Sequence, residues 1–267
     1  MRNYKIPTLT IAGSDSSGGA GIQADLKTFS AIGTYGMSVI TAITAQNTQG
    51  VFDVEELSKE IIRGQMKAVF EDIPPKGVKI GMVSSPEIIL EISENLKKYS
   101  PEVIVVDPVM ISKSGYSLLR PEAKENLIKY LIPMAYLITP NVPEAEEITG
   151  IKIETVEDMK KAGKEILKLG PKYVLMKGGH LDGDAVDVLM GEDLFEVFTS
   201  ERINRKNTHG TGCTLSSAIT SYIALGYDVV EAVRLSKTYI TEAIRHSFDI
   251  GHGVGPVNHF YKFENVD

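Results

Sequence analysis

The sequence predicts an α/β protein with an open three-layer α/β/α fold, in which a mostly parallel central sheet carries antiparallel strands at one edge. Short, nearly continuous apolar runs alternate with stretches of helical spacing along most of the chain. Strands that are buried on both faces of a parallel sheet have this composition. The alternation breaks at residues 185–203, where strand-like runs follow each other without a helix. A closed eightfold barrel needs a helix after each strand, so this segment favours an open sheet.

Strands and helices are expected to follow each other in chain order. Apolar runs typical of strands cover residues 8–13, 38–46, 77–83, 102–107, 136–139 and 173–179. Helical spacing runs through Leu26 and Phe29 to Gly33, from Leu57 to about Phe70, and over residues 86–98, 121–132, 156–169, 211–225 and 228–247. Because no long linker divides these elements, residues 1–267 are expected to form a single domain.

Local signals mark the ends of two of these helices. Thr155 stands where an N-cap is expected, and Gly170 follows the same helix as a stop. Asp228 and Glu231 resemble a capping pair at the start of the last helix. We therefore expect both helices to begin at these polar residues.

Charge and cysteine content narrow the class of protein. The net charge is −7, and an acidic chain has no overall attraction for nucleic acid. Apolar runs such as residues 103–106 are too short to span a bilayer, and the first residues lack the apolar core of a signal peptide. The single cysteine excludes an intramolecular disulfide and a zinc site made of clustered cysteines. We expect a cytoplasmic protein without nucleic-acid or membrane partners.

That cysteine lies in NTHGTGCTLSSAI, residues 207–219, where a glycine-rich turn opens a helix. Gly210 and Gly212, with Thr211 between them, let backbone N–H groups converge, and the helix N-terminus adds positive potential. Such a turn can bind an anion such as phosphate. The same potential favours a thiolate, so the pKa of Cys213 is expected to be lowered. A buried structural cysteine is the alternative interpretation, and a redox role would need a second cysteine.

Polar side chains follow three of the predicted strands. Asp107 follows EVIVV, Asn141 and Glu144 follow YLIT, and Lys177 ends YVLMK. Ligands of open α/β sheets bind at the carboxyl ends of the strands. Carboxylates at this edge suit Mg²⁺, which also binds waters and phosphate oxygens, and a lysine can neutralise a phosphate. Each residue alone has a simpler interpretation, for example Glu144 as a helix first-turn acid, but their joint placement favours a phosphate and metal site.

Other residues are candidates for binding a ring. Asp25 and Gln46 are polar residues in apolar surroundings, and they could recognise the donor and acceptor edge of a polar heterocycle. Met82 and Val109 could flank a flat ring, although packing in the core is their alternative role.

The glycine-rich stretch near the N-terminus fits neither common nucleotide motif. Residues 13–19, GSDSSGG, lack the lysine of a P-loop. Residues 19–24, GAGIQA, match the dinucleotide fingerprint formally, but no Asp or Glu lies between Leu26 and Phe52 to hold a ribose. A nicotinamide oxidoreductase is therefore disfavoured. A turn that lets the chain and a helix pack closely is the alternative.

Taken together, these motifs resemble the ribokinase-like superfamily, and within it the bacterial hydroxymethylpyrimidine and phosphomethylpyrimidine kinases of thiamine biosynthesis. The similar stretches span nearly the whole chain in order: AGSDSSGGAGIQADLKTFSAIG, VITAITAQNTQGV, KIGMV, VVDPVM, SKSG, ITPNVPEAE, VLMKGGH, NTHGTGCTLSSAI and GHGVGPVNH. The resemblance implies the open α/β/α sheet, ATP as co-substrate, Mg²⁺ and often a homodimer.

The resemblance also implies roles for individual residues. The pyrimidine pocket would be formed by Gly13, Asp25, Gln46, Met82 and Val109. The metal and phosphate acids would be Asp107 and Glu144, with Asn141, Lys177 and Thr211 toward ATP. The anion hole and catalytic position would be Gly210, Gly212 and Cys213. The stretch SKSG, residues 112–115, would be a loop that can cover the site.

Cys213 also bears on the substrate. Most sugar kinases of the superfamily have Asp at this position, whereas the pyrimidine kinases and some bacterial pyridoxal kinases resemble this chain. The expected reaction is phosphorylation of 4-amino-5-hydroxymethyl-2-methylpyrimidine and its monophosphate by ATP, with the Cys213 thiolate accepting the hydroxyl proton. Pyridoxal remains the alternative substrate. A cysteine hydrolase would need a base and an orienting acid, and His209 has no evident partner acid. A non-catalytic ligand sensor is a further alternative.

Overall fold

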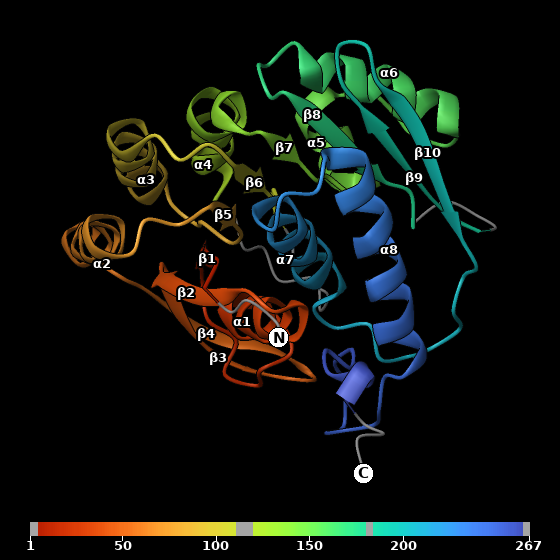
Figure 1. The fold of residues 1–267 in the computed structure, drawn as a ribbon, viewed down its shortest axis with the longest axis horizontal. Coiled ribbons are helices and arrows are strands. Elements are labelled where there is room, and N and C mark those ends of the chain that lie inside the picture. Colours follow the sequence, from red (N-terminus) through yellow and green to blue (C-terminus); the bar gives the residue numbers. More distant parts are fainter. Residues whose placement is uncertain (1–4, 111–119, 180–183, 264–267) are drawn as a thin grey trace.

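The computed structural model describes residues 5–110, 120–179 and 184–263, and an eight-stranded sheet runs through its centre (Figure 1). Its strands are β1 (Pro7–Ala12), β2 (Tyr35–Ile40), β5 (Gly77–Ile80), β6 (Ile104–Val106), β7 (Leu137–Ile138), β8 (Tyr173–Lys177), β9 (Ala185–Met190) and β10 (Phe195–Ser200). The spatial order is β10-β9-β8-β7-β6-β5-β1-β2; β9 runs antiparallel to both of its neighbours, β8 and β10, and all other neighbouring strands are parallel. The predicted open sheet with an antiparallel edge is confirmed.

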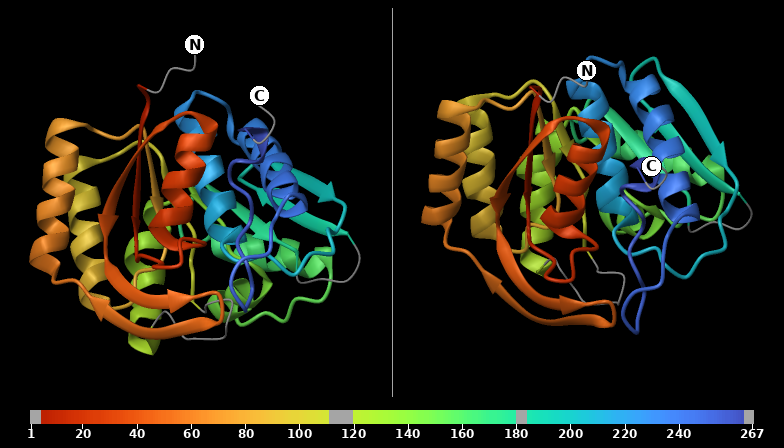
Figure 2. Two further views of the ribbon diagram at one scale, coloured as in Figure 1. Left: turned by 90° about the horizontal axis from the view of Figure 1, so that it is seen from below. Right: turned by 60° about the horizontal axis from the view of Figure 1, so that its bottom comes forward.

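Helices cover both faces of this sheet, as the two views in Figure 2 show. One face carries α1 (Gly21–Ile32), α7 (Thr211–Ala224) and α8 (Val229–Arg245). The other carries α2 (Lys59–Asp72), α3 (Pro86–Tyr99), α4 (Pro121–Asn126), α5 (Val142–Thr149) and α6 (Val156–Leu167). A π-helical turn (Leu127–Leu131) and a 3-10 turn (Ile132–Met134) continue α4, and a second 3-10 turn (Tyr261–Phe263) lies near the C-terminus. Within the described ranges, none of the helices combines the length and apolar character that crossing a bilayer demands.

Two apolar cores lie between these layers. Successive residues of a strand point to opposite faces, so Val105 packs toward α7 and α8 while Val106 packs toward α3 and α4. Leu137 and Ile138 repeat this division on β7. Each such side chain contributes roughly 1.5–3 kcal/mol when it is fully buried. This two-sided burial explains why the strands appear in the sequence as continuous apolar runs.

The predicted single strand over residues 38–46 is wrong. The chain leaves the central sheet at Thr41, whose hydroxyl donates a 2.9 Å hydrogen bond to the carbonyl of Met82. The following strand β3 (Ala42–Asn47) pairs antiparallel with β4 (Gly50–Glu56) in a separate two-stranded hairpin. Burial alternates along β3, because only one face of the hairpin meets the rest of the protein.

The predicted helix starts are confirmed at both positions. The Thr155 hydroxyl accepts a hydrogen bond from the backbone of Asp158, whose carboxylate bonds back to Thr155. Asp228 accepts a 2.9 Å hydrogen bond from the backbone N–H of Glu231. Gly170, after α6, adopts a positive φ of 112°. Capping residues of this kind contribute about 0.5–2 kcal/mol each.

The C-terminal segment is fastened to the fold by a buried histidine. The His259 ring nitrogen Nε2 lies 3.0 Å from the Thr214 hydroxyl, and the Tyr239 hydroxyl donates a 2.6 Å hydrogen bond to the His259 carbonyl. Burial, and next the charge of Lys27, lower the pKa of His259 to about 3. The folded protein therefore keeps this ring neutral at pH values where the unfolded chain protonates it.

This arrangement predicts a loss of stability in mild acid. Between pH 6.5 and 3, His259 binds a proton in the unfolded chain but not in the folded protein. The free energy of unfolding therefore falls as the pH falls through this window. At pH 5 the effect amounts to about 2 kcal/mol. Urea titrations at pH 7 and pH 5 should show this decrease in the wild type and a smaller one in His259→Gln. The control His252→Gln, at an exposed histidine, should follow the wild type; equal decreases in all three proteins would contradict the assignment.

Candidate active site

A large cavity opens at the carboxyl ends of the parallel strands. Its volume of about 1520 Å³ exceeds the 300–1,000 Å³ that is common for a single ligand, so it has room for two. Every predicted site residue except Asp25 lines it: Gly13, Gln46, Met82, Asp107, Val109, Asn141, Glu144, Lys177, Gly210, Thr211, Gly212 and Cys213. The predicted covering loop at residues 112–115 lies outside the described residues.

The turn before α7 has the geometry of an anion site. Gly210 is the N-cap of α7 and adopts a positive φ of 79°, which favours glycine. A Cβ atom at Gly210 would also lie 1.8 Å from the carbonyl oxygen of Gly19, so α7 starts in direct backbone contact with the glycine-rich turn. The first N–H groups of a helix have no partner within the helix. The N–H groups of Thr211, Gly212 and Cys213 lie at this helix N-terminus, which borders the cavity. They therefore favour the binding of an anion there.

The prediction that the pKa of Cys213 is lowered is wrong. Burial raises the pKa of the thiol to about 11. The carboxylates of Asp25 and Asp107 add to this effect, whereas the ammonium group of Lys79 and the backbone N–H of Gly21 oppose it. The loss of water around the sulfur thus outweighs the effects of Lys79 and of the Gly21 N–H, which both favour the thiolate. In the protein without ligands, Cys213 is a neutral thiol at pH 7.

The polar residues at the carboxyl ends of β6, β7 and β8 form one cluster. Lys177 Nζ lies 2.8 Å from Asp107 Oδ1, and the Thr139 hydroxyl donates a 3.1 Å hydrogen bond to the same oxygen. Burial alone would raise the pKa of Asp107, but the charges of Lys177 and Lys79 hold it below its ordinary value. Asp107 is therefore a carboxylate at neutral pH, although it is buried.

Glu144 and Asn141 build the start of α5. Asn141 Oδ1 accepts a 2.9 Å hydrogen bond from the Glu144 backbone, and Glu144 Oε2 accepts one of 2.9 Å from the Asn141 backbone. Burial raises the pKa of Glu144 to about 7; Asp107 acts in the same direction and Lys177 against it. A cation at the cavity would favour the ionised form.

Asp107 and Glu144 suit a cation that completes its coordination shell with other ligands. The described residues hold no group of three His, Cys, Asp or Glu side chains that could bind a metal by themselves. Among the described residues, the hydrogen bond to Asp107 Oδ2 is a long one, of 3.4 Å, from the Ser216 hydroxyl. Mg²⁺ commonly uses one or two carboxylates and completes its shell with waters and phosphate oxygens. The donor set of Asp107 and Glu144 fits that pattern.

The predicted ring-binding residues other than Asp25 also line the cavity. A Cβ atom at Gly13 would lie 2.2 Å from the Met82 methyl carbon, so the position of Met82 depends on this glycine. Gln46 belongs to β3, and its backbone exchanges two 2.8 Å hydrogen bonds with the Ser16 hydroxyl. Val109 follows β6 on the same cavity. These residues give the cavity an apolar wall with one amide side chain.

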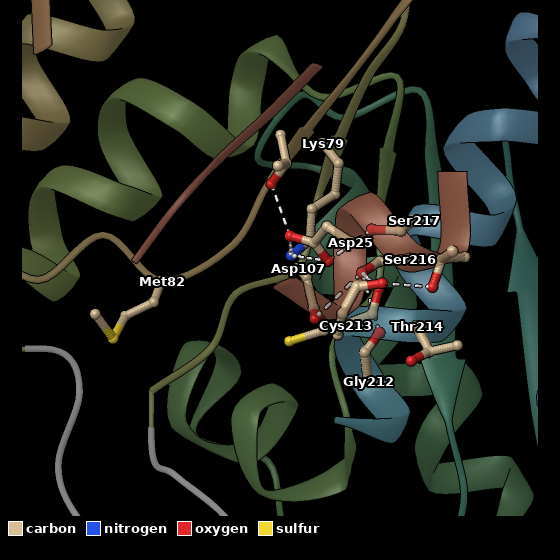
Figure 3. Close-up of polar contacts among 12 residues, drawn as sticks. Asp25, Lys79, Met82, Asp107, Gly212, Cys213, Thr214, Ser216 and Ser217 are labelled. Atoms are coloured by element: carbon tan, nitrogen blue, oxygen red, sulfur yellow. Dashed lines mark hydrogen bonds and ion pairs between the residues drawn. The ribbon is translucent and has the colours of Figure 1, made fainter. Parts of the chain in front are cut away.

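Asp25 lies elsewhere than predicted. Its side chain is fully buried beneath the cavity, and both of its oxygens are occupied. Oδ1 lies 3.0 Å from Lys79 Nζ and accepts a 2.7 Å hydrogen bond from Ser217; Oδ2 lies 2.9 Å from Lys79 Nζ and accepts one of 2.7 Å from Thr10. The predicted pairing of Asp25 with Gln46 around a ring is therefore replaced by a buried ion pair with Lys79 (Figure 3).

Lys79 and Asp15 were missed in the sequence, and His209 was considered only as the base of a cysteine hydrolase. Lys79 lines the cavity, and its signal was a single charge within the apolar run GVKIGMV. His209 and Asp15 also line it, with 2.7 Å between His209 Nε2 and Asp15 Oδ2. Burial would raise the pKa of Asp15, but hydrogen bonds from His209 and Ser17 lower it to about 2. His209 thus has Asp15 as its partner acid. The sequence did not reveal this pair, because the two residues are 194 positions apart.

Comparison with known proteins agrees with this geometry. Residues 15–258 match the family described as phosphomethylpyrimidine kinase. A hydroxymethylpyrimidine/phosphomethylpyrimidine kinase from Bacillus subtilis is 47% identical over 97% of this chain and 96% of its own length. A thiamine biosynthesis bifunctional protein from Geobacter sulfurreducens is 50% identical over 97% of this chain, which spans 53% of that relative's length.

Solved structures are similar over most of the chain. A phosphomethylpyrimidine kinase from Clostridium difficile is 76% identical, with a TM-score of 0.81 over 90% of this chain and 99% of the other. A pyridoxal kinase from Staphylococcus aureus, in complex with AMP-PCP and pyridoxal, is 37% identical, with a TM-score of 0.89 over 97% and 96% of the two chains. With this match in sequence and fold, the chain belongs to the phosphomethylpyrimidine kinase family.

Proposed function

We propose that the protein transfers the γ-phosphate of ATP to the hydroxymethyl group of 4-amino-5-hydroxymethyl-2-methylpyrimidine, and then phosphorylates the monophosphate to the diphosphate in thiamine biosynthesis. The observation that carries the proposal is the meeting of three features at one cavity. These are the anion-binding start of α7, the acid and lysine cluster, and the apolar wall with Gln46. The cavity volume accommodates a nucleotide beside a small ring.

ATP and Mg²⁺ would meet at the cluster after β6 and β8. Asp107 and Glu144 would hold Mg²⁺, which when bound would neutralise part of the phosphate charge. Lys177 is anchored by Asp107, and the pKa of its ammonium group is raised by Asp107 and Glu144 despite burial. It is therefore a fixed positive charge, suited to the phosphates together with Asn141 and Thr211. The AMP-PCP complex of the pyridoxal kinase relative supports ATP as the phosphoryl donor.

Positioning and charge stabilisation account for most of the proposed catalysis. The first N–H groups of α7 would stabilise the transferring phosphoryl group. The substrate oxygen forms the new bond to phosphorus, the bond to the leaving ADP oxygen breaks, and the hydroxyl proton passes to the Cys213 sulfur. Only a thiolate can accept this proton. The high pKa of Cys213 therefore limits the rate at neutral pH.

Pyridoxal is the second candidate substrate, because the relative bound to pyridoxal has the same fold. The identity of 76% to the pyrimidine kinase against 37% to that relative favours the pyrimidine. A cysteine hydrolase is disfavoured, because the Nε2 atom of His209 is occupied by Asp15 at 2.7 Å.

We also propose that the protein is a cytoplasmic homodimer. The resemblance to the family supports this assembly. The exposed side chains of Ile43 and Phe52 on the β3–β4 hairpin are 45% and 66% accessible, and a second copy could cover them. Light scattering of the purified protein measures the assembly directly.

Release of ADP with three acceptors in turn tests the proposed function. The expected result is turnover with the hydroxymethylpyrimidine and with its monophosphate, and a lower kcat/KM with pyridoxal. Omission of the acceptor controls for ATP hydrolysis. Turnover with pyridoxal but with neither pyrimidine would replace the proposed substrate by the alternative.

Substitution of the proposed base gives a second prediction. Cys213→Ala should lower kcat by about 10²–10⁴-fold, which is the usual contribution of a general base. Its affinity for ATP, measured by calorimetry, should change little because the backbone N–H groups remain. Alkylation should inactivate the wild type and leave the residual activity of Cys213→Ala unchanged, because the chain has no other cysteine. Undiminished turnover in Cys213→Ala would remove the base assignment.

A further inference from the structure

We infer that Lys79, anchored by Asp25, is a positioning residue whose charge controls how readily the Cys213 thiol gives up its proton. The inference rests on the proposed function only where it connects this control to turnover. The ionisation of the thiol itself can be measured without any substrate.

Lys79 occupies an unusual place for a charged side chain. It lies on β5 in the middle of the sheet, is completely buried, and still lines the floor of the cavity. A Cβ atom at Gly81 would lie only 2.5 Å from Lys79 Nζ. The ammonium group therefore packs directly against Gly81, which precedes Met82 in the chain. Its distances of 3.0 and 2.9 Å to the two oxygens of Asp25 fix it there.

The same network reaches the helix that carries the thiol. Ser217 donates a 2.7 Å hydrogen bond to Asp25 Oδ1, and Ser217 lies one turn after Cys213 on α7. Residues four apart share one face of a helix. Cys213 therefore lies on the face of α7 that meets the ion pair of Asp25 and Lys79. Figure 3 shows these side chains gathered at the start of α7.

Charges from four elements act on the thiol. Burial raises its pKa, and Asp25 on α1 and Asp107 after β6 raise it further. Lys79 on β5 lowers it, and Lys177 on β8 interacts favourably with the thiolate. The two partners of one ion pair thus act on Cys213 in opposite directions. Asp25 nevertheless supports the proposed base, because it fixes the position of the Lys79 ammonium group.

A purely stabilising role explains this ion pair less well. Burying two charges costs several kcal/mol per ion, and apolar replacements of buried pairs are often neutral or stabilising. Here the lysine lines the cavity together with Cys213, the proposed base, and Asp25 connects it to α7 through Ser217. An apolar pair could not place a positive charge at this position.

Alkylation kinetics test the inference, because Cys213 is the only thiol in the chain. The rate of reaction with iodoacetamide is followed against pH in metal-free buffer, with Lys79→Met, Asp25→Asn and the wild type. An opposite charge at this range shifts a pKa by about 1–3 units. At pH 8.5 we expect alkylation to be about tenfold or more slower in Lys79→Met and about tenfold or more faster in Asp25→Asn. The opposite signs distinguish charge control from disruption, which would expose the thiol and accelerate both variants.

Two further variants control for misfolding and for nonspecific effects of removing a buried charge. Lys237→Met breaks another buried ion pair, between Lys237 and Asp187 at 2.6 Å, and should leave alkylation at the wild-type rate. If either single variant fails to fold, as judged by circular dichroism, the double variant Asp25→Asn/Lys79→Met removes both charges, and its rate should lie between those expected for the singles. Wild-type alkylation in Lys79→Met, or a shift in the same direction in both single variants, would overturn the inference.

Turnover provides the link to the proposed function. The kcat of Lys79→Met should fall while its KM for ATP changes little, and higher pH should restore part of the loss. If Cys213→Ala retained full turnover, the role of the thiol as base would fail. The alkylation result would still decide whether Lys79 controls its ionisation.

Discussion

The buried ion pair between Asp25 and Lys79 is the interaction on which the arrangement of the site depends. Asp25 accepts hydrogen bonds from Thr10 and Ser217 and so connects β1, β5, α1 and α7 at one point. An apolar contact at this place could pack the same elements together. It would supply neither a charge to the floor of the cavity nor the fixed hydrogen bonds that set the relative positions of α1 and α7.

The remaining architecture follows from where parallel strands end. Apolar packing on both faces secures the sheet, and the polar residues that cannot join those cores collect at its carboxyl edge. There α1 and α7 both begin, and Gly210 brings their first turns into backbone contact through Gly19. The site thus combines an anion-binding turn with acids and lysines whose charges are fixed by their neighbours. Such preorganised charge is the main requirement for phosphoryl transfer.

The sequence predicted those parts of the site that depend on local pattern. Asp107 and Glu144 follow strands, Lys177 ends one and Gly210 precedes a helix, so their convergence follows from the rule for open sheets. Contacts between distant segments were beyond such reasoning. Asp25 is separated from Lys79 by 54 residues and His209 from Asp15 by 194. The hairpin at residues 42–56 was missed because Thr41 leaves the sheet through a bond to Met82. The pKa of Cys213 was misjudged because the helix N-terminus is visible in the sequence and the depth of burial is not.

The central claim is that the partly buried thiol of Cys213 accepts the proton in phosphoryl transfer once it has ionised. The dependence of kcat on pH tests it most directly, in the wild type and in Cys213→Asp. A pKa of about 11 for Cys213 means that the thiolate fraction rises tenfold per pH unit, so log kcat of the wild type should rise with a slope near one between about pH 7 and 9. An Asp carboxylate ionises far below the thiol, so the profile of Cys213→Asp should level off by about pH 8 while that of the wild type keeps rising. A flat profile for the wild type, or the same slope in both proteins, would contradict the account.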